Sequence, residues 1–296
     1  MGVWVDTDFG FDDLWALLLL RTFGVALDGV SLVAGNSTLD NVTLNALGAR
    51  LAFGLDWPFF TGAAEPLNRP LETAERVLGP RGMQTRGAHL PEAPQETLPP
   101  CGPALVAWLE ENEGPREVLA LGPLTNLARL AMDAPGAFSR ISRLVWMGGS
   151  AGRGNQTPFA EFNAHADAEA IKVVAETGVP FAIVDLEACH QATYGEADIP
   201  TGMPEPLGVL MGGYLDIAIT RGRDWMPIYD PLAALVFTHP EVLIFEPRVL
   251  DVDTGTLETY GQTRFERAGE STVSLATGVA PNAARLCLDG LARLAV

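Results

Sequence analysis

The chain has 296 residues, of which 48% are hydrophobic, and its formal net charge is −18. This composition is typical of a globular protein with a sizeable core, and the acidic balance argues against nucleic-acid or anionic-membrane partners. The longest apolar run, Leu14–Leu20, is too short to span a bilayer, and Met1 leads into a strand without an export signal. The three cysteines are widely spaced, so we expect no disulfide framework or zinc site and a cytoplasmic location.

Strand-like and helix-like segments alternate over the first two thirds of the chain. Short apolar runs predict strands at Val3–Val5, Val30–Ala34, Phe59–Thr61, Val118–Leu121, Leu144–Met147 and Phe181–Asp185. Apolar residues that recur at three- and four-residue spacing predict helices at Asp12–Phe23, Leu39–Phe53, Leu124–Met132 and Asp167–Thr177. This order implies right-handed βαβ crossovers, and hence an α/β fold with an open, mostly parallel sheet and helices on both faces.

The remaining segments break this alternation. Residues 63–100 are rich in proline, glycine and charge, which indicates an excursion over the surface, with a flap as one interpretation. We predict a helical segment that ends near Asp230–Val236, extra C-terminal strands within residues 242–276, and a closing helix at Asn282–Leu294. Neither an internal repeat nor a linker divides the sequence, so we predict a single domain over residues 1–296.

The end of the first strand carries four carboxylates within eight positions: Asp6, Asp8, Asp12 and Asp13. Such a density of like charge requires either protonation or a cation, because anions a few ångströms apart repel strongly. Carboxylate oxygens are hard ligands that suit Ca²⁺ or Mg²⁺. The alternative is a solvated acidic loop and helix start, but the position at a strand end favours a metal site.

Other polar clusters also follow predicted strands. Asn36 comes after the second strand, and residues 122–126 and 148–163 come after two later ones. Open parallel sheets bind ligands beyond the carboxyl ends of their strands. We therefore expect these clusters to converge with the aspartates on one cleft.

Five segments match a known pattern when they are taken in chain order. They are Asp6–Asp13, Ala34–Thr38, Leu124–Asn126, Val145–Gly149 together with Ala160–Asn163, and Ile228–Pro231. Together they resemble the inosine-uridine-preferring nucleoside hydrolase family, and the resemblance extends along the whole chain. Phe9 stands where the first motif usually has proline. The resemblance implies that family's fold and hydrolysis of the N-glycosidic bond of a ribonucleoside to ribose and free base.

A calcium centre is part of what the resemblance implies. Asp8, Asp13 and Asp230 are similar to the family's calcium-ligating carboxylates, and Thr125 to the residue that offers its main-chain carbonyl. Ca²⁺ also suits a large set of oxygen ligands on general grounds. A water molecule and the 2′- and 3′-hydroxyls of ribose would complete the site, and Asp8 would take the proton of that water.

The resemblance also implies a set of substrate contacts. Asp12 and Asn36 would bind the 2′-hydroxyl region, Asn155 and Glu161 the 5′-hydroxyl, and Asn163 the 3′-hydroxyl, with Met147 and Phe162 beside the nucleoside. Deoxyribonucleosides should therefore be poor substrates. The structural alternatives are a turn residue for Asn36, a solvated side chain for Glu161, core packing for Met147 and Phe162, and helix caps for Thr125 and Asp230.

Tyr229 departs from the pattern, because inosine-uridine-preferring members have a histidine immediately before the late aspartate. A phenol can donate a hydrogen bond and stack on a base, but its ordinary pKa near 10 makes it a slower proton donor at neutral pH. Other candidate donors to the departing base are Tyr214, Asp216, Arg221 and His89, whereas His190 is interpreted as structural. The preferred base and its proton donor therefore stay open.

Two other functions compete with this hypothesis. The departure at Tyr229 favours a calcium-dependent ribose or nucleoside-binding protein without efficient catalysis. A strand that ends in Asp-x-Asp also occurs in haloacid dehalogenase-type phosphatases, but Lys172 is the only lysine and lies in a predicted helix. We predict a ribonucleoside hydrolase with Ca²⁺ as cofactor, and the resemblance implies a homodimer or homotetramer.

Overall fold

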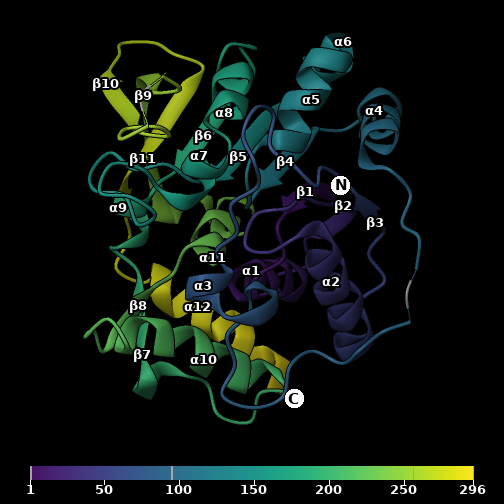
Figure 1. The fold of residues 1–296 in the computed structure, drawn as a ribbon, viewed down its shortest axis with the longest axis vertical. Helices are drawn as coiled ribbons and strands as arrows, with labels where there is room; N and C mark the ends of the chain where they lie inside the picture. The colour runs from purple at the N-terminus through teal and green to yellow at the C-terminus, as the bar shows by residue number, and fades with distance from the viewer. Residues whose placement is uncertain (1, 95, 256, 296) are drawn as a thin grey trace.

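The structure is a computed structural model that describes residues 2–94, 96–255 and 257–295. Within these residues, nine strands form one sheet in the order β10-β9-β11-β6-β5-β4-β1-β2-β3, and β7 pairs with β8 in a second sheet. Neighbouring strands from β11 to β3 are parallel, whereas β9 is antiparallel to both β11 and β10. The predicted α/β class and the extra C-terminal strands are confirmed (Figure 1).

The strands are β1 (Gly2–Thr7), β2 (Ala26–Leu32), β3 (Phe59–Thr61), β4 (Glu117–Ala120), β5 (Arg143–Met147), β6 (Phe181–Val184), β7 (Thr193–Gly195), β8 (Trp225–Pro227), β9 (Leu243–Val252), β10 (Thr263–Arg267) and β11 (Val273–Val279). The helices of at least eight residues are α1 (Phe11–Thr22), α2 (Leu39–Phe53), α4 (Cys101–Glu111), α5 (Thr125–Asp133), α8 (Ala168–Ala175), α10 (Leu207–Ile219) and α12 (Ala283–Ala292). Shorter helices are α3 (Glu75–Leu78), α6 (Pro135–Phe138), α7 (Phe162–Ala166), α9 (Leu186–Cys189) and α11 (Asp230–Ala234).

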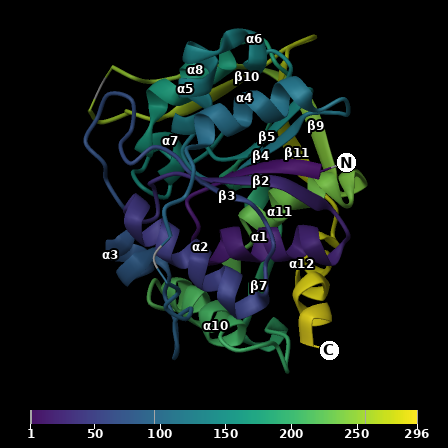
Figure 2. The ribbon, with the colours of Figure 1, turned by 90° about the vertical axis from the view of Figure 1, so that its right-hand side faces the viewer.

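The central strand β1 shows how the sequence covers both faces of the sheet. Its side chains alternate, so Val3 and Val5 pack in the core on the side of α1 and α2, and Trp4 packs on the side of α4 and α5. Figure 2 shows the two helix layers on either side of the sheet. Burial on both faces explains why the strand reads as a continuous apolar run.

Among the helices of at least eight residues, α4 and α10 lie outside the predicted elements. The α10 sequence is apolar on nearly every side and contains Gly212 and Gly213, so it has neither amphipathic spacing nor high helix propensity. Gly213 is required for close packing, because a Cβ there would lie 2.4 Å from the Cα of Thr85. Within the described residues, the structure contains no helix long and apolar enough to cross a membrane.

The excursion of residues 63–100 is anchored to the rest of the molecule by polar contacts. Arg86 forms ion pairs with Glu196, just after β7, at 2.7 Å and with Asp216 on α10 at 2.8 Å. Nearer the start of the excursion, Arg81 donates from Nε to the side chain of Asn45 on α2 at 3.1 Å. The excursion therefore holds α3 in a defined place over the carboxyl ends of the strands.

Candidate active site

A cavity of about 470 Å³ lies where the carboxyl ends of β1, β4 and β5 meet α3, α9, α10 and α11. Its lining includes all but two of the residues that the sequence predicted for metal binding, substrate binding or catalysis. These lining residues are Asp8, Asp12, Asn36, Met147, Asn155, Glu161, Phe162, Asn163, Tyr229 and Asp230. The predicted convergence of the strand-end clusters on one cleft is confirmed.

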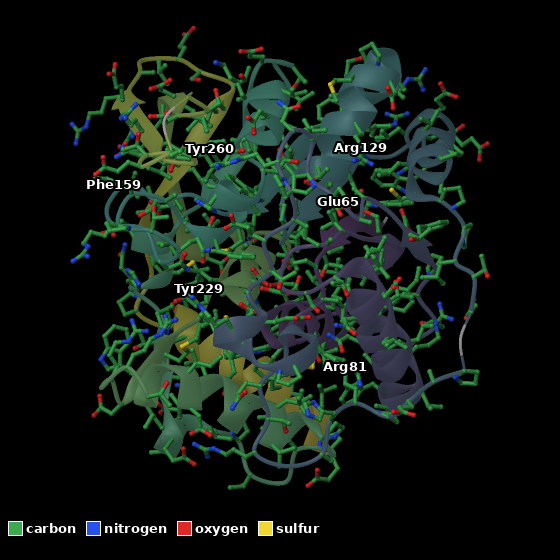
Figure 3. All side chains as sticks on the ribbon, viewed as in Figure 1. Glu65, Arg81, Arg129, Phe159, Tyr229 and Tyr260 are labelled. Carbon is green, nitrogen blue, oxygen red and sulfur yellow. The ribbon has the colours of Figure 1, made fainter. Side chains whose placement is uncertain are left out.

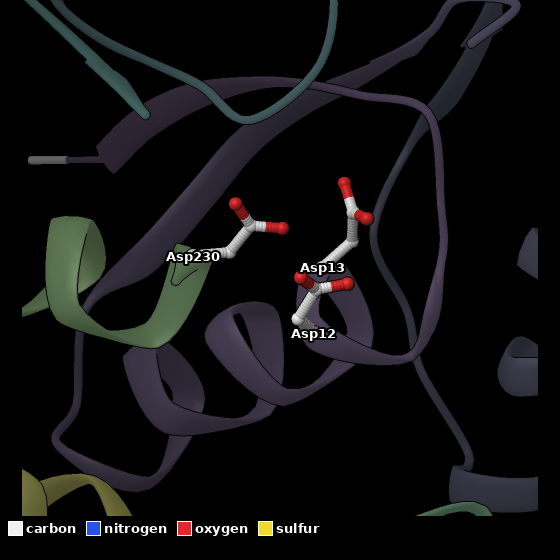
Figure 4. A group of neighbouring side chains, drawn as sticks. All are labelled: Asp12, Asp13 and Asp230. Carbon is white, nitrogen blue, oxygen red and sulfur yellow. The ribbon is translucent and has the colours of Figure 1, made fainter. Parts of the chain in front are cut away.

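Four carboxylates gather at one side of this cavity. Oxygen atoms of Asp12, Asp13 and Asp230 lie within 4.8 Å of one another, and Figure 4 shows these side chains facing a common space between α1 and α11. Asp8 is linked to Asp13 by Asn36, whose Nδ2 donates to both carboxylates at 3.1 and 3.4 Å. Asp12 is predicted to bind the sugar. Its carboxylate nevertheless lies close enough to those of Asp13 and Asp230 to share a metal ion with them.

Burial and mutual repulsion change the acidity of these groups. Burial first, and then the neighbouring carboxylates, raise the pKa of Asp8 and of Asp230 well above the ordinary value, and raise that of Asp12 to about 7. Hydrogen bonds from Thr7 and Gly10 partly offset the rise in the pKa of Asp13, which burial dominates. A set of buried oxygen anions that repel one another in this way suits a hard divalent cation.

The loop that carries Asp8 depends on an uncommon backbone conformation. Phe9 has a φ of +44°, in the left-handed region, and its backbone N–H donates to Oγ1 of Thr7 at 3.0 Å. A proline could adopt neither this φ nor this hydrogen bond, so the residue of the usual motif would not fit this loop as it is folded here. Gly35, which follows β2, allows its segment to lie close against the loop that carries Asp8. A Cβ at this position would lie 2.2 Å from Oδ2 of Asp8.

Thr125 and Asp13 are the predicted site residues that do not appear among the described lining residues. Asp13 is fully buried next to Asp12 and Asp230, whereas Oγ1 of Thr125 donates to Asp167 at 2.7 Å. Thr125 and Asp230 are the first residues of α5 and α11, with Leu124 and Tyr229 at the cap positions. The interpretation of Thr125 and Asp230 as helix caps is therefore wrong by one residue, and the carbonyl role of Thr125 stays a prediction.

The predicted sugar-binding residues are held by backbone hydrogen bonds. Glu161 is buried and accepts from the N–H groups of Gly149, Asn163 and Ala164 at 2.8 to 3.0 Å, so the solvated alternative is wrong. Nδ2 of Asn163 donates to the carbonyls that follow β4 and end β5, at 2.8 and 3.1 Å. Asn155 is exposed and accepts from Phe162 at 2.9 Å. These hydrogen bonds hold the three side chains in place, so their remaining polar atoms have fixed positions from which to contact a ligand.

Replacing Glu161 with Gln should flatten the dependence of stability on pH. Burial raises the pKa of Glu161 to about 7, so the folded state binds a proton that the unfolded state releases above its ordinary pKa. Stability should therefore be greatest near pH 4 to 5 and fall by up to about 3 kcal/mol as pH rises toward 8. Urea unfolding of cation-free protein between pH 5 and 8 measures this slope, and an unchanged slope in E161Q would contradict the assignment.

The cavity lining also carries aromatic and cationic groups. They are Tyr214, Tyr229, His190, Arg221 and Arg223. Tyr214 is already engaged, since its hydroxyl donates to Asp12 at 2.5 Å. Two other candidate donors, Asp216 and His89, are not among the described lining residues.

Sequence reasoning missed two parts of this wall. The first part is α3, which contributes Ala74, Val77 and Leu78 to the cavity lining. This segment has no sequence motif, and only the tertiary fold places it at the cavity. Arg223 sits in a turn before β8, where a lone arginine carries no sequence signal. His190, interpreted as structural, also lines the cavity.

Comparison with known proteins agrees with this geometry. A family model described as inosine-uridine preferring nucleoside hydrolase matches residues 3–286. A pyrimidine-specific ribonucleoside hydrolase RihA from Shewanella woodyi is 34% identical and aligns over 90% of this chain and 88% of its own length. The corresponding protein of Salmonella schwarzengrund is 33% identical, over 88% and 86%.

Solved structures share the fold at lower identity. A purine-preferring ribonucleoside hydrolase from Gardnerella vaginalis has a TM-score of 0.91 at 20% identity, over 100% of this chain and 99% of the other. The plant nucleoside hydrolase PpNRh1 has a TM-score of 0.87 at 24% identity, over 98% of both chains. The family match covers nearly the whole chain and includes the strand ends that build the cavity. The protein is thus a member of the inosine-uridine preferring nucleoside hydrolase family, a hydrolase that acts on N-glycosyl compounds.

Proposed function

We propose that this enzyme hydrolyses the N-glycosidic bond of ribonucleosides with Ca²⁺ as its cofactor and Asp8 as the group that receives the proton of the attacking water. The observation that carries this proposal is the gathering of four carboxylates at one end of a cavity of about 470 Å³. Asp8, Asp13 and Asp230 would hold the ion with the carbonyl of Thr125. When bound, the ion supplies positive charge that acidifies water and binds the vicinal hydroxyls of ribose.

Asp8 is suited to receive a proton in this site. Its two oxygens accept from the backbone N–H and from Nδ2 of Asn36 at 2.7 and 3.1 Å, so the carboxylate is held in one orientation at the cavity wall. Burial and the neighbouring anions raise its pKa in the cation-free site, and a bound cation would oppose that rise. The fixed orientation of the carboxylate at the cavity wall, rather than this pKa, is what suits Asp8 to the role of base.

The remaining predicted residues would orient the sugar. Asp12 and Asn36 lie beside Asp8 and would bind the 2′-hydroxyl, Asn163 the 3′-hydroxyl, and Asn155 with Glu161 the 5′-hydroxyl. Met147 and Phe162 line the wall next to this group and offer apolar contact to the nucleoside. Fixed polar groups of this kind place the anomeric carbon relative to the attacking water and lower the entropic part of the barrier.

A substrate panel tests the proposed function. Because the curated relatives are named pyrimidine-specific, uridine and cytidine are the first substrates, followed by inosine, adenosine and nicotinamide riboside. We expect release of base from at least one ribonucleoside, loss of the reaction in the presence of a chelator, and much slower cleavage of the matching 2′-deoxynucleoside. Binding of a ribonucleoside without release of base after long incubation would instead indicate a binding protein.

Location and assembly complete the proposal. We expect a cytoplasmic enzyme that forms a homodimer or homotetramer, as the resemblance implies. Light scattering at several concentrations measures the mass. The phosphatase alternative is superseded by the family assignment, and Lys172 lies on α8, outside the described lining of the cavity.

A further inference from the structure

The structure raises the question of which group stabilises the departing base. When the bond between C1′ and the base nitrogen breaks, the electron pair stays on the base, which then carries negative charge until it gains a proton. Tyr229 (Figure 3) occupies the position of the family's histidine. A phenol, with an ordinary pKa near 10, is a weak acid at neutral pH, so another group must meet the developing charge.

Arg223 has the features that such a group requires. It lines the cavity together with Tyr229 and His190, and its guanidinium carries a permanent positive charge. Its Nε is buried and has no hydrogen-bond partner among the described residues. A buried donor without a partner is costly, so a partner supplied by a ligand would remove that cost.

The position of Arg223 is fixed by its surroundings. Its backbone N–H donates to the carbonyl of Ala218 at the end of α10, at 3.1 Å. Its guanidinium lies over the ring of Trp225, with the central carbon 5.3 Å from the ring centroid. A planar cation stacked in this way loses little entropy when it binds a second group.

We propose that Arg223 binds the departing base and stabilises the negative charge that develops on it. This inference rests on the proposed function and names the leaving-group residue of that same site. In the reaction, the oxygen of water bonds to C1′, the electron pair of the C1′–N bond passes to the base, and one proton of the water goes to Asp8. The base then takes up a proton from solvent, and Arg223 keeps its own protons throughout.

Two neighbouring groups are weaker candidates for this role. Arg221 also lines the cavity, but its side chain is exposed, so water and salt screen its charge. Burial lowers the pKa of His190, with Glu187 opposing this effect and Arg223 adding to it, so the imidazole is a weaker source of positive charge than a guanidinium. The half-buried Arg223 is the fixed positive charge that screening reduces least.

The test compares two kinds of leaving group in the calcium-loaded enzyme. A ribonucleoside cleaved by the wild type needs help for its base, whereas 4-nitrophenolate leaves from 4-nitrophenyl β-D-ribofuranoside as a stable anion. We expect Arg223→Gln to lower kcat for the nucleoside about 100-fold, the usual loss for one donor aimed at developing charge, and to change the nitrophenyl reaction less than about threefold. Arg223→Lys should recover part of the nucleoside activity, because it restores the charge without the planar fork.

The controls separate this role from a structural one. Arg285→Gln removes the same charge from an exposed side chain outside the cavity lining, and it should leave both reactions unchanged. Equal losses on both substrates in R223Q and R223K, or a nucleoside-selective loss in His190→Gln but not in R223Q, would overturn the inference. A wild type that cleaves the nitrophenyl riboside but no nucleoside would instead contradict the proposed function.

Discussion

Asp8→Asn should abolish nucleoside hydrolysis and leave the folded protein at least as stable as the wild type in the absence of a cation. Asparagine has nearly the same shape but cannot accept the proton of water, and it removes one anion from the proposed ion site. Loss of a positioned base alone costs up to about 10⁴-fold in rate, so a loss of at least this size is expected. Steady-state kinetics at saturating Ca²⁺ measures it.

The expected gain in stability distinguishes a functional carboxylate from a structural one. Asp8 is 1% exposed, and its pKa is raised by burial and by repulsion from Asp13 and Asp12, so its charge opposes folding. Thermal unfolding in chelator should therefore show an equal or higher Tm for D8N than for the wild type. A large drop in Tm would mean that the loss of activity reflects misfolding.

Asp6→Asn is a matched control for this substitution. Asp6 lies on the same strand and is also buried, with a pKa of about 7, but it accepts from Asn126 at 2.8 Å and is not among the described lining residues. D6N should keep most of the activity. Ribose affinity measured by calorimetry should survive in D8N if Ca²⁺ still binds, and this result would separate catalysis from binding.

The sequence predicts those parts of the molecule that depend on local patterns. Leu39–Phe53 is helical over the predicted range because it combines three- and four-residue apolar spacing with a Thr38 cap and a left-handed Gly54 at its end. The carboxylates after β1 can be placed in a site because strand ends meet at one edge of a parallel sheet. Their convergence with Asp230, more than two hundred residues later, followed from the family resemblance rather than from spacing.

Features that depend on packing between distant segments could not be predicted. The contribution of α3 to the cavity depends on contacts between distant segments, since Glu75 of α3 accepts from Nδ2 of Asn41 at 3.1 Å. In the same excursion, the ion pairs of Arg86 with Glu196 and Asp216 join segments more than one hundred residues apart. The α10 helix is nearly uniform in hydrophobicity, so its burial follows from what covers it rather than from a pattern. The positive φ of Phe9 likewise has no signal in its residue type, since such values are uncommon for a bulky side chain.

Removal of the cation should have the second large effect, on activity and on stability together. A chelator should reduce nucleoside hydrolysis by at least about 10³-fold, because both the acidified water and the grip on the ribose hydroxyls depend on the ion. Ca²⁺ should restore the activity, and Mg²⁺ should do so less well, because Mg²⁺ keeps its waters and demands a stricter octahedral geometry. Full activity in the metal-free enzyme would exclude the proposed site.

Binding of the same ion should also be measurable, independently of catalysis, as an increase in the stability of the folded protein. Free Ca²⁺ at 100 times its dissociation constant should stabilise the fold by about 2.7 kcal/mol, which for a chain of this length corresponds to a rise in Tm of about 4 °C. Protons compete with the ion for carboxylates whose pKa values burial and repulsion have raised, that of Asp12 to about 7. The rise in Tm should therefore shrink as the pH falls from 8 to 5.

Asp13→Asn provides the matched test of this linkage. It removes one proposed ligand without changing the described lining of the cavity, so the calcium-dependent rise in Tm should disappear while the fold persists. D6N should retain the full rise. If D13N and D6N respond to Ca²⁺ alike, the ion binds elsewhere, and the raised pKa values of the four carboxylates would then mean that protons rather than a metal neutralise the site.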